Sequence, residues 1–307
     1  MVRQERARPR LQHVEHQPAV GAVLSGPISG LLLTHFSWHT MMVLEGLPAW
    51  VWAVVWWRYI PRSLEQAAWL LPAEREALVG GLAAEQASFD VTIGQMDLRR
   101  VLLHPDVWLL LVAKTFNNMV AYGFTLWLPT AIKEASSLAI GNVGLLSALP
   151  YVAAGIGAYA IGRSSDQRRE RRLHGAIPLM MQGVLLLCIA HVGTQSIWIQ
   201  MVFFTLAGLF LFMTLPLITV MYTDLLPRRQ AVIAIAFSGA IANLFGGFFG
   251  PMLVGWLKSL TGNFSLAFTV LAGVGLAGGL LMLAVREPGG RAAAESSPAG
   301  TPAAAGD

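Results

Sequence analysis

Long apolar segments separated by short polar ones run along most of this chain, and they leave few folds open to it. A helix needs about 20 mostly apolar residues to cross the hydrocarbon core of a bilayer. Eight segments approach that length: 19–36, 40–60, 107–129, 141–162, 175–193, 197–223, 231–257 and 264–285. Because backbone polar groups cannot stay unsatisfied in lipid, we predict an all-α integral membrane protein with about eight spanning helices.

Composition and missing motifs exclude several classes of function. Only 12% of residues are charged, about half the share in soluble domains, and a net charge of +4 gives no reason to expect nucleic-acid binding. The single cysteine, Cys188, excludes a disulfide framework and most zinc sites. Neither Ser29 nor Ser238 lies in a Gly-x-Ser-Gly motif, and there is no H-E-x-x-H, no paired intramembrane Asp and no G-x-x-x-x-G-K-S/T. We predict a protein that is not an enzyme and needs no metal or cofactor.

The positive charges fix one topology. With eight spans, 18 of the 21 Lys and Arg residues fall on one side of the membrane, and only Lys133 and Lys258 fall on the other. Lys and Arg are retained in the cytoplasm. We therefore expect a multi-pass protein of the inner (cytoplasmic) membrane with both termini in the cytoplasm.

The remaining segments complete the predicted organisation. Residues 1–18 are polar, carry four Arg and lack the apolar core of a secretory signal, so they are expected to form a cytoplasmic leader. Residues 61–106 are predicted to be a cytoplasmic linker with a surface helix, and residues 287–307, rich in Ala, Gly and Pro, to be a disordered cytoplasmic tail. Two helices (19–60) and a six-helix bundle (107–286) would flank the linker.

The third predicted span carries the densest set of polar residues at membrane depth. Lys114, Asn117, Asn118 and Tyr122 follow an i, i+3, i+4, i+8 spacing, so they share one helix face. A cation and neutral hydrogen-bond donors on one face suit an aqueous path for an anion. For Lys114 a second interpretation stays open, in which its side chain snorkels to the cytoplasmic surface.

Glu45 is the one acidic residue well inside a predicted span. A carboxyl group there can carry a proton, because desolvation favours its neutral form. The alternative is a structural role in which Glu45 pairs with a neighbouring side chain.

Two Gly-Pro pairs interrupt apolar segments. Gly26-Pro27 lies in the first span and Gly250-Pro251 in the seventh. Proline removes a backbone donor and kinks a helix, whereas glycine permits close contact between helices. We expect both pairs to mark bends where helices move against their neighbours.

Several stretches resemble one known family. The run Gly162-x-x-x-Asp166-x-Arg168 with Arg171-Arg172 is similar to the G-x-x-x-D-R-x-G-R-R loop of the major facilitator superfamily, with Gln167 in place of one Arg. The stretches "WHTMMVLEGLPAW", "LWLPTAIKE", "VGLLSALPY" and "NLFGGFFGPMLVGWLKSLTG" resemble its anion:cation symporters, which include carriers of tartrate, phthalate, glucarate and hydroxyphenylacetate. The resemblance implies an MFS-type helical bundle matching helices 5 to 12 of a twelve-helix carrier, without helices 1 to 4.

The resemblance also implies roles for individual residues. Tyr151, Thr214 and Asn243 would join the polar face of the third span around a substrate cavity, although relatives often carry Asn where this chain has Gly239. The run from Gly162 to Arg172 would form a gating loop, and the two Gly-Pro pairs would occupy equivalent helices of two related halves.

Two hypotheses of different classes follow. In the first, the protein is a proton-coupled symporter of a small organic anion, a carboxylate such as a sugar acid, tartrate or an aromatic acid, working by alternating access and driven by the proton gradient. In the second, it is a truncated, non-transporting remnant or a partner subunit of such a carrier. In the second case Gly21, Gly26, Ser29 and Gly30 are expected to lack close-packing partners. The oligomeric state is left open.

Overall fold

The computed structural model describes residues 17–61, 63, 71–72, 74–76, 78–82, 103–168, 170–192, 196–226 and 228–285. The predicted tail, the leader up to residue 16 and most of the predicted linker therefore lie outside the described residues, but residues 72, 74–76 and 78–82, within the predicted surface helix of the linker, are helical.

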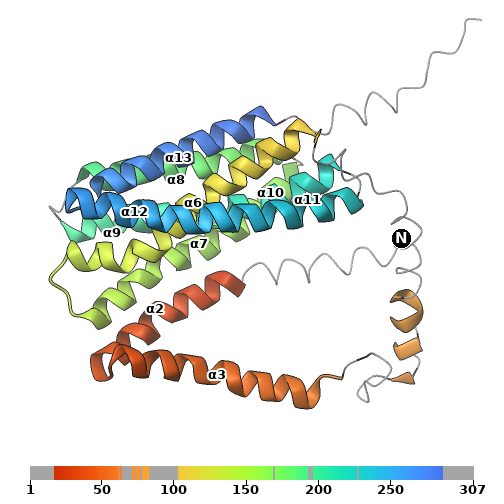
Figure 1. The fold of residues 1–307 in the computed structure, drawn as a ribbon, viewed down its shortest axis with the longest axis horizontal. Helices are drawn as coiled ribbons and strands as arrows, with labels where there is room; N and C mark the ends of the chain where they lie inside the picture. Colours follow the sequence, from red (N-terminus) through yellow and green to blue (C-terminus); the bar gives the residue numbers. More distant parts are fainter. Residues whose placement is uncertain are drawn as a thin grey trace, which may run out of the picture.

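Every regular element among the described residues is helical (Figure 1). The helices are α2 (Gln17–His35), α3 (Trp38–Tyr59), α6 (Pro105–Glu134), α7 (Ile140–Arg168), α8 (Arg172–Val192), α9 (Ile197–Leu209), α10 (Thr214–Leu225), α11 (Arg228–Ile241), the π-helix η2 (Ala242–Gly246), α12 (Gly247–Thr261) and α13 (Ser265–Ala284). The all-α fold is as predicted, and each predicted span coincides with one helix or with two or three consecutive helices.

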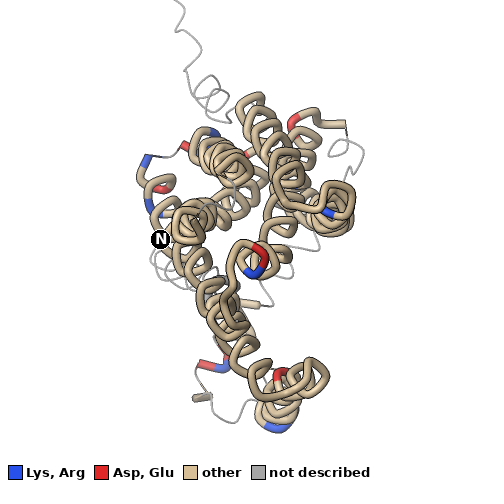
Figure 2. The backbone as a smooth tube through the Cα atoms, turned by 90° about the vertical axis from the view of Figure 1, so that its left-hand side faces the viewer, with Lys and Arg blue, Asp and Glu red and all other residues tan. Residues whose placement is uncertain are grey.

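Six helical segments of the described chain are long and apolar enough to cross a membrane. Figure 2 shows that long stretches of the helices carry no Lys, Arg, Asp or Glu. The two predicted spans outside this group are α2 and α6. Helix α2 is rich in small and hydroxylated residues, and α6 carries the polar face described above.

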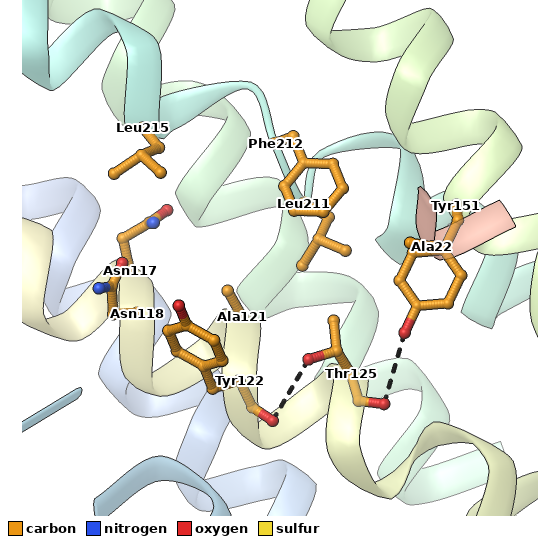
Figure 3. Close-up of a pocket in the computed structure, with 10 residues that line it drawn as sticks. All are labelled: Ala22, Asn117, Asn118, Ala121, Tyr122, Thr125, Tyr151, Leu211, Phe212 and Leu215. Atoms are coloured by element: carbon orange, nitrogen blue, oxygen red, sulfur yellow. Dashed lines mark hydrogen bonds between the residues drawn. The ribbon is translucent and has the colours of Figure 1, made fainter. Parts of the chain in front are cut away.

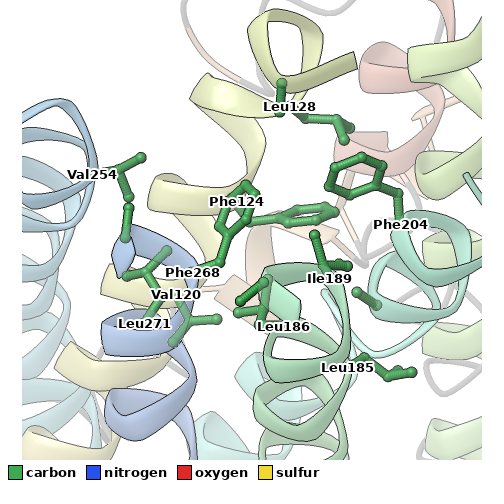
Figure 4. Close-up of a cluster of buried hydrophobic side chains, with 14 of the residues drawn as sticks. Val120, Phe124, Leu128, Leu185, Leu186, Ile189, Phe204, Val254, Phe268 and Leu271 are labelled. Atoms are coloured by element: carbon green, nitrogen blue, oxygen red, sulfur yellow. The ribbon is translucent and has the colours of Figure 1, made fainter. Parts of the chain in front are cut away.

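Helices α6 to α13 pack into one bundle whose buried apolar residues form two clusters. Phe124 on α6, Phe204 on α9 and Phe268 on α13 meet at its centre, with ring centroids 6.1 Å apart for Phe124–Phe204 and 6.2 Å for Phe204–Phe268 (Figure 4). Leu128 and Leu186 fill the space around these rings. Edge-to-face contacts of this kind add to the dispersion energy of a close-packed interior.

Two of the predicted spans are not continuous α-helices. The segment predicted as 197–223 is interrupted by turns at residues 210–213 between α9 and α10, and the segment predicted as 231–257 contains η2 between α11 and α12. Neither interruption lies at a Gly-Pro pair. Pro27 and Pro251 both lie inside helices that continue through them, and the expectation that these pairs mark bends where helices move stays a prediction.

The glycines of both Gly-Pro pairs lie at very close helix contacts. Helix α2 crosses α7 so tightly that a Cβ added at Gly26 would lie 2.8 Å from the carbonyl oxygen of Gly144, and a Cβ at Gly144 would collide with the carbonyl oxygen of Gly26. In the bundle, a Cβ at Gly250 would collide in the same way with the carbonyl oxygen of Met119 on α6. The expected loss of packing partners was therefore wrong for Gly26 and Gly30, which pack on α7, and correct for Gly21, which has open space around it.

Helix α3 stands apart from the bundle. It follows α2 after a short turn in which the Ser37 hydroxyl caps its N-terminus by accepting a hydrogen bond from the Thr40 N–H. None of its residues is buried, and Figure 1 shows it running beside α2 on the side away from the bundle. Among the described residues, helix α2 is thus the element that packs both on α3 and on the bundle.

The α2–α7 crossing predicts a position-specific effect of a single methyl group. Replacing Gly144 by Ala should destabilise the protein by about 1–3 kcal/mol, because the new Cβ would overlap the Gly26 carbonyl and force the helices apart. Thermal unfolding in detergent should show a fall of several degrees in Tm. The matched control is Gly21→Ala on α2, where the added methyl meets no atom within 4 Å and Tm should hold or rise. Equal Tm values for the two variants would contradict the close crossing.

Candidate functional site

Six polar side chains form a strip along the contact between α6 and the α11–η2 segment. We call Lys114, Asn117, Asn118, Tyr122, Ser238 and Asn243 the polar strip. Its two helices are joined by three hydrogen bonds. Lys114 Nζ donates to Ser238 Oγ at 3.3 Å, Asn118 Nδ2 to Asn243 Oδ1 at 3.0 Å, and the Tyr122 hydroxyl to Asn243 Oδ1 at 3.5 Å. The predicted polar face of α6 is therefore turned partly toward a second polar helix.

The π-helix η2 contains Asn243 of the strip. A π-helical turn accommodates an extra residue and changes which side chains face a neighbouring helix. It is held close to α6 by Gly246, where an added Cβ would lie 2.5 Å from the carbonyl oxygen of Thr115. The close contact at Gly246 and the hydrogen bond between the side-chain amides of Asn118 and Asn243 lie within one helical turn of each other.

A cavity of about 330 Å³ adjoins the strip. Its walls come from α2, α6, α7, α10 and the turn between α9 and α10 (Figure 3), and they consist of Ala22, Asn117, Asn118, Ala121, Tyr122, Thr125, Tyr151, Leu211, Phe212 and Leu215. Four of the predicted cavity residues, Asn117, Asn118, Tyr122 and Tyr151, thus lie together. The volume is at the lower end of the range for small-molecule sites.

Tyr151 lines the cavity, whereas Thr214 does not. The Tyr151 hydroxyl donates to the carbonyl oxygen of Thr125 across the cavity wall at 3.4 Å (Figure 3). Thr214 is fully buried and donates to the carbonyl oxygen of Gly175 on α8 at 3.1 Å. The prediction that Thr214 lines the cavity was therefore wrong, because its hydroxyl satisfies a backbone group inside the bundle.

Lys114 is the one cation of the strip, and it is only 6% exposed. Its ammonium group reaches the Ser238 hydroxyl, which in turn donates to the carbonyl oxygen of Ile235 at 3.1 Å. Among the described residues no carboxylate forms an ion pair with it. A side chain buried in this way does not reach the surface of the bundle, but neither Lys114 nor Asn243 is among the residues that line the cavity of about 330 Å³, so their role in a substrate path stays a prediction.

Sequence reasoning missed seven residues of the site: Ala22, Ala121, Thr125, Leu211, Phe212, Leu215 and Ser238. Leu211 and Phe212 enter the cavity wall through the turn at 210–213, which no Gly or Pro marks. Ser238 was considered only as a failed protease motif, although a serine beside Gly239 in an otherwise apolar segment was a usable signal.

Glu45 lies on α3, outside the cavity and the strip. It accepts a hydrogen bond from the Ser29 hydroxyl of α2 at 2.5 Å. This pairing matches the structural alternative stated for Glu45, and a role in proton coupling stays a prediction.

The predicted gating loop is compact. Gly162, Asp166 and Arg168 belong to the last turns of α7, and Arg172 begins α8. Arg171, between these helices, donates to Asp166 Oδ1 at 2.7 Å and lies 3.9 Å from Asp224 Oδ2 at the end of α10. The arginine therefore links three helices at this end of the bundle.

Glu170 caps α8 beside this arginine. Its carboxylate accepts hydrogen bonds from the N–H groups of Leu173 and His174 at 2.5 and 3.1 Å, and the His174 ring lies 2.5 Å from it. Partial burial raises the pKa of Glu170, but the hydrogen bonds from His174 and from the two backbone N–H groups outweigh burial, so the pKa lies below its usual value. A negative charge is favoured at this helix end.

The Glu170 cap predicts a pH-dependent stability difference. Because the pKa of Glu170 is lowered by folding, its stabilisation is complete above the unfolded-state pKa of about 4.3 and is lost as the pH falls through the lowered value. Replacing Glu170 by Gln should cost about 0.5–1 kcal/mol near pH 7, with the difference in Tm shrinking below about pH 4. The Glu76→Gln change, at an exposed carboxylate, serves as the control for loss of one negative charge. A Tm difference for Glu170→Gln that is the same at pH 7 and pH 3.5 would refute the cap.

No group of three or more His, Cys, Asp or Glu side chains in the described part of the chain is arranged to hold a metal ion. The chemistry available at the strip is accordingly that of one ammonium group, three amides, a hydroxyl and a phenol.

Comparison with known proteins places the fold in a family. The family model described as Major Facilitator Superfamily matches residues 19–244 and, in a second alignment, residues 131–305. A "Putative tartrate transporter" of Agrobacterium vitis is 31% identical over 277 residues, covering 86% of this chain and 59% of the relative. The "Putative metabolite transport protein NicT" of Pseudomonas putida is 28% identical over 261 residues (83% and 59%), and the "Hexuronate transporter" of Bacillus subtilis is 23% identical over 279 residues (88% and 63%).

The chain spans about 59% of the length of the first two of these relatives. The matches cover both α2–α3 and the bundle of α6 to α13. This chain is a multi-pass membrane protein and belongs to the Major Facilitator Superfamily.

Proposed function

We propose that this protein carries a small organic anion across the cytoplasmic membrane in symport with a proton, by alternating access. The substrate would be a carboxylate such as a sugar acid, tartrate or an aromatic acid. The proton gradient would drive the cycle without a cofactor, and both termini would lie in the cytoplasm, on the side where Lys and Arg gather.

The observation that carries this proposal is the buried ammonium group of Lys114. An ion held inside a protein without a counter-charge costs several kcal/mol, and a bound anion would offset much of that cost. The neighbouring groups, the amides of Asn117, Asn118 and Asn243 and the Tyr122 phenol, are neutral donors that can bind carboxylate and hydroxyl oxygens. The names of the relatives, which include tartrate and hexuronate transporters, support the same substrate class.

We assign the binding of the co-transported proton to the carboxyl group of Glu45. Its carboxylate shares a short hydrogen bond with Ser29 on α2, and α2 is the helix that contacts both α7 and the cavity through Gly26 and Ala22. Protonation would change this bond and so bias the α2–α3 pair between two arrangements.

Substrate binding should depend on the charge of Lys114. The purified chain in detergent should bind at least one of L-tartrate, D-glucuronate and 4-hydroxyphenylacetate, and Lys114→Gln should weaken that binding at least tenfold, because the anion loses its counter-charge. Isothermal titration calorimetry measures the affinity, and a ligand-dependent rise in Tm provides a second measure. Lys133→Gln is the matched control, since Lys133 bonds to the carbonyl oxygen of Leu138, outside the strip. Equal affinities for wild type and Lys114→Gln would overturn the proposal.

The exposure of α3 favours a second candidate, a non-transporting protein or a partner subunit. Its tryptophans are largely uncovered, with Trp50 at 75% and Trp57 at 80% exposure, and none of its residues is buried. A rocking carrier moves one bundle against another around the bound substrate, whereas here only α2 packs on the bundle of α6 to α13.

Uptake by the chain alone separates the two candidates. The proposed symport predicts that proteoliposomes containing the chain accumulate labelled tartrate or glucuronate above the level of empty vesicles, whereas the second candidate predicts no uptake above that level. The measurement is uptake under an imposed proton gradient, with and without a protonophore. Protonophore-sensitive uptake above the empty-vesicle level would rule out the second candidate and establish symport by this chain.

A further inference from the structure

The ammonium group of Lys114 has open space on one side, and Gly239 creates that space. A Cβ added at Gly239 would lie 3.7 Å from Lys114 Nζ and would meet no other atom within 4 Å. Gly239 itself is partly exposed, whereas Lys114 is buried. The lysine is therefore covered by protein on its other sides, and a ligand can approach its charge past the α-carbon of Gly239.

A second group of donors lies one helical turn away on the same two helices. Asn118 is four residues after Lys114 on α6, and Asn243 is four residues after Gly239. Four residues correspond to about 6 Å along a helix axis. Both hydrogen bonds at Asn243 use its Oδ1 atom, so its Nδ2 hydrogens are left for an oxygen of a ligand.

We propose that Gly239 is a specificity-determining residue, because its missing side chain leaves a seat for a substrate carboxylate against Lys114 Nζ. This deepens the proposed function and rests on it. The position of this seat determines where the anionic group of the substrate binds and which lengths of substrate fit. A ligand with a carboxylate and a second oxygen-bearing group about 6 Å away reaches both Lys114 and the amide of Asn243. Small dicarboxylates and hydroxy acids have these dimensions, and a monocarboxylate with an apolar tail lacks the second contact.

A carboxylate built into the chain tests the seat. In Gly239→Asp the new side chain should occupy the seat and pair with Lys114. L-Tartrate binding should then fall at least tenfold, and the Tm of the protein without ligand should exceed that of Gly239→Asn, the uncharged control of the same size, by about 2 °C or more. The gain in Tm should disappear in the Lys114→Gln background, since the two substitutions are coupled only through the ion pair. Damage to the fold would instead lower Tm and binding together.

Each result separates this inference from the proposed function. If wild type binds tartrate and Gly239→Asp binds it equally well, the seat is refuted and the proposed function stands. If binding falls but the Tm of Gly239→Asp does not exceed that of Gly239→Asn, the aspartate does not reach Lys114 and the seat is likewise refuted. If wild type binds none of L-tartrate, D-glucuronate and 4-hydroxyphenylacetate, the proposed function fails, and the Tm comparison alone decides whether a carboxylate fits beside Lys114.

Discussion

Close contact between helix backbones at glycine is the constraint on which the rest of this structure depends. Lipid tails are as apolar as leucine side chains, so burial of apolar surface gives helices in a membrane little reason to associate. Small residues allow their backbones to approach and gain dispersion energy instead. Gly144 on α7, Gly208 on α9 and Gly250 on α12 each lie where an added Cβ would collide with a backbone carbonyl oxygen of another helix. The apolar core around Phe124 and Phe268 fills the space that these contacts enclose.

The same contacts position the candidate site. Gly246 and Gly250 hold η2 and α12 against α6, and only at that separation can the short amide side chains of Asn118 and Asn243 meet at 3.0 Å. Lys114 is buried for the same reason, because α11 lies close enough for Ser238 to reach its ammonium group. A charge that would be costly in lipid is thereby retained next to a cavity. The glycines thus fix both how the helices pack and which polar groups an anion would meet.

The sequence predicted the helices and about half of the site residues, because these follow from local properties of the chain. The spans, and the shared face of Lys114, Asn117, Asn118 and Tyr122, follow from hydropathy and from helical periodicity, which are local properties. The break at residues 210–213 and the π-helix at Ala242–Gly246 depend on packing against α7 and α6, and neither carries a proline or a glycine pair at its start. Since Leu211 and Phe212 enter the cavity wall through that break, their place could not be read from periodicity. The contact between Gly26 and Gly144 could not be predicted either, because the two residues are more than a hundred positions apart in the sequence.

The two Gly-Pro pairs show how one local motif serves two places in the structure. In both, the glycine approaches the backbone of a neighbouring helix, and the proline follows inside a helix that continues. The carbonyl oxygen of Pro251 also accepts a hydrogen bond from the Trp127 indole of α6 at 2.9 Å, which ties α12 further to the bundle. Among the described residues no corresponding side chain bonds to the carbonyl of Pro27, so α2 is held to α7 chiefly by packing. A contact made by packing of small residues can slide or separate with less loss than one that also breaks hydrogen bonds. The α2–α7 crossing is therefore the contact in this structure best suited to change in the proposed transport cycle, and the α6–α12 contact is the one suited to stay fixed around the polar strip.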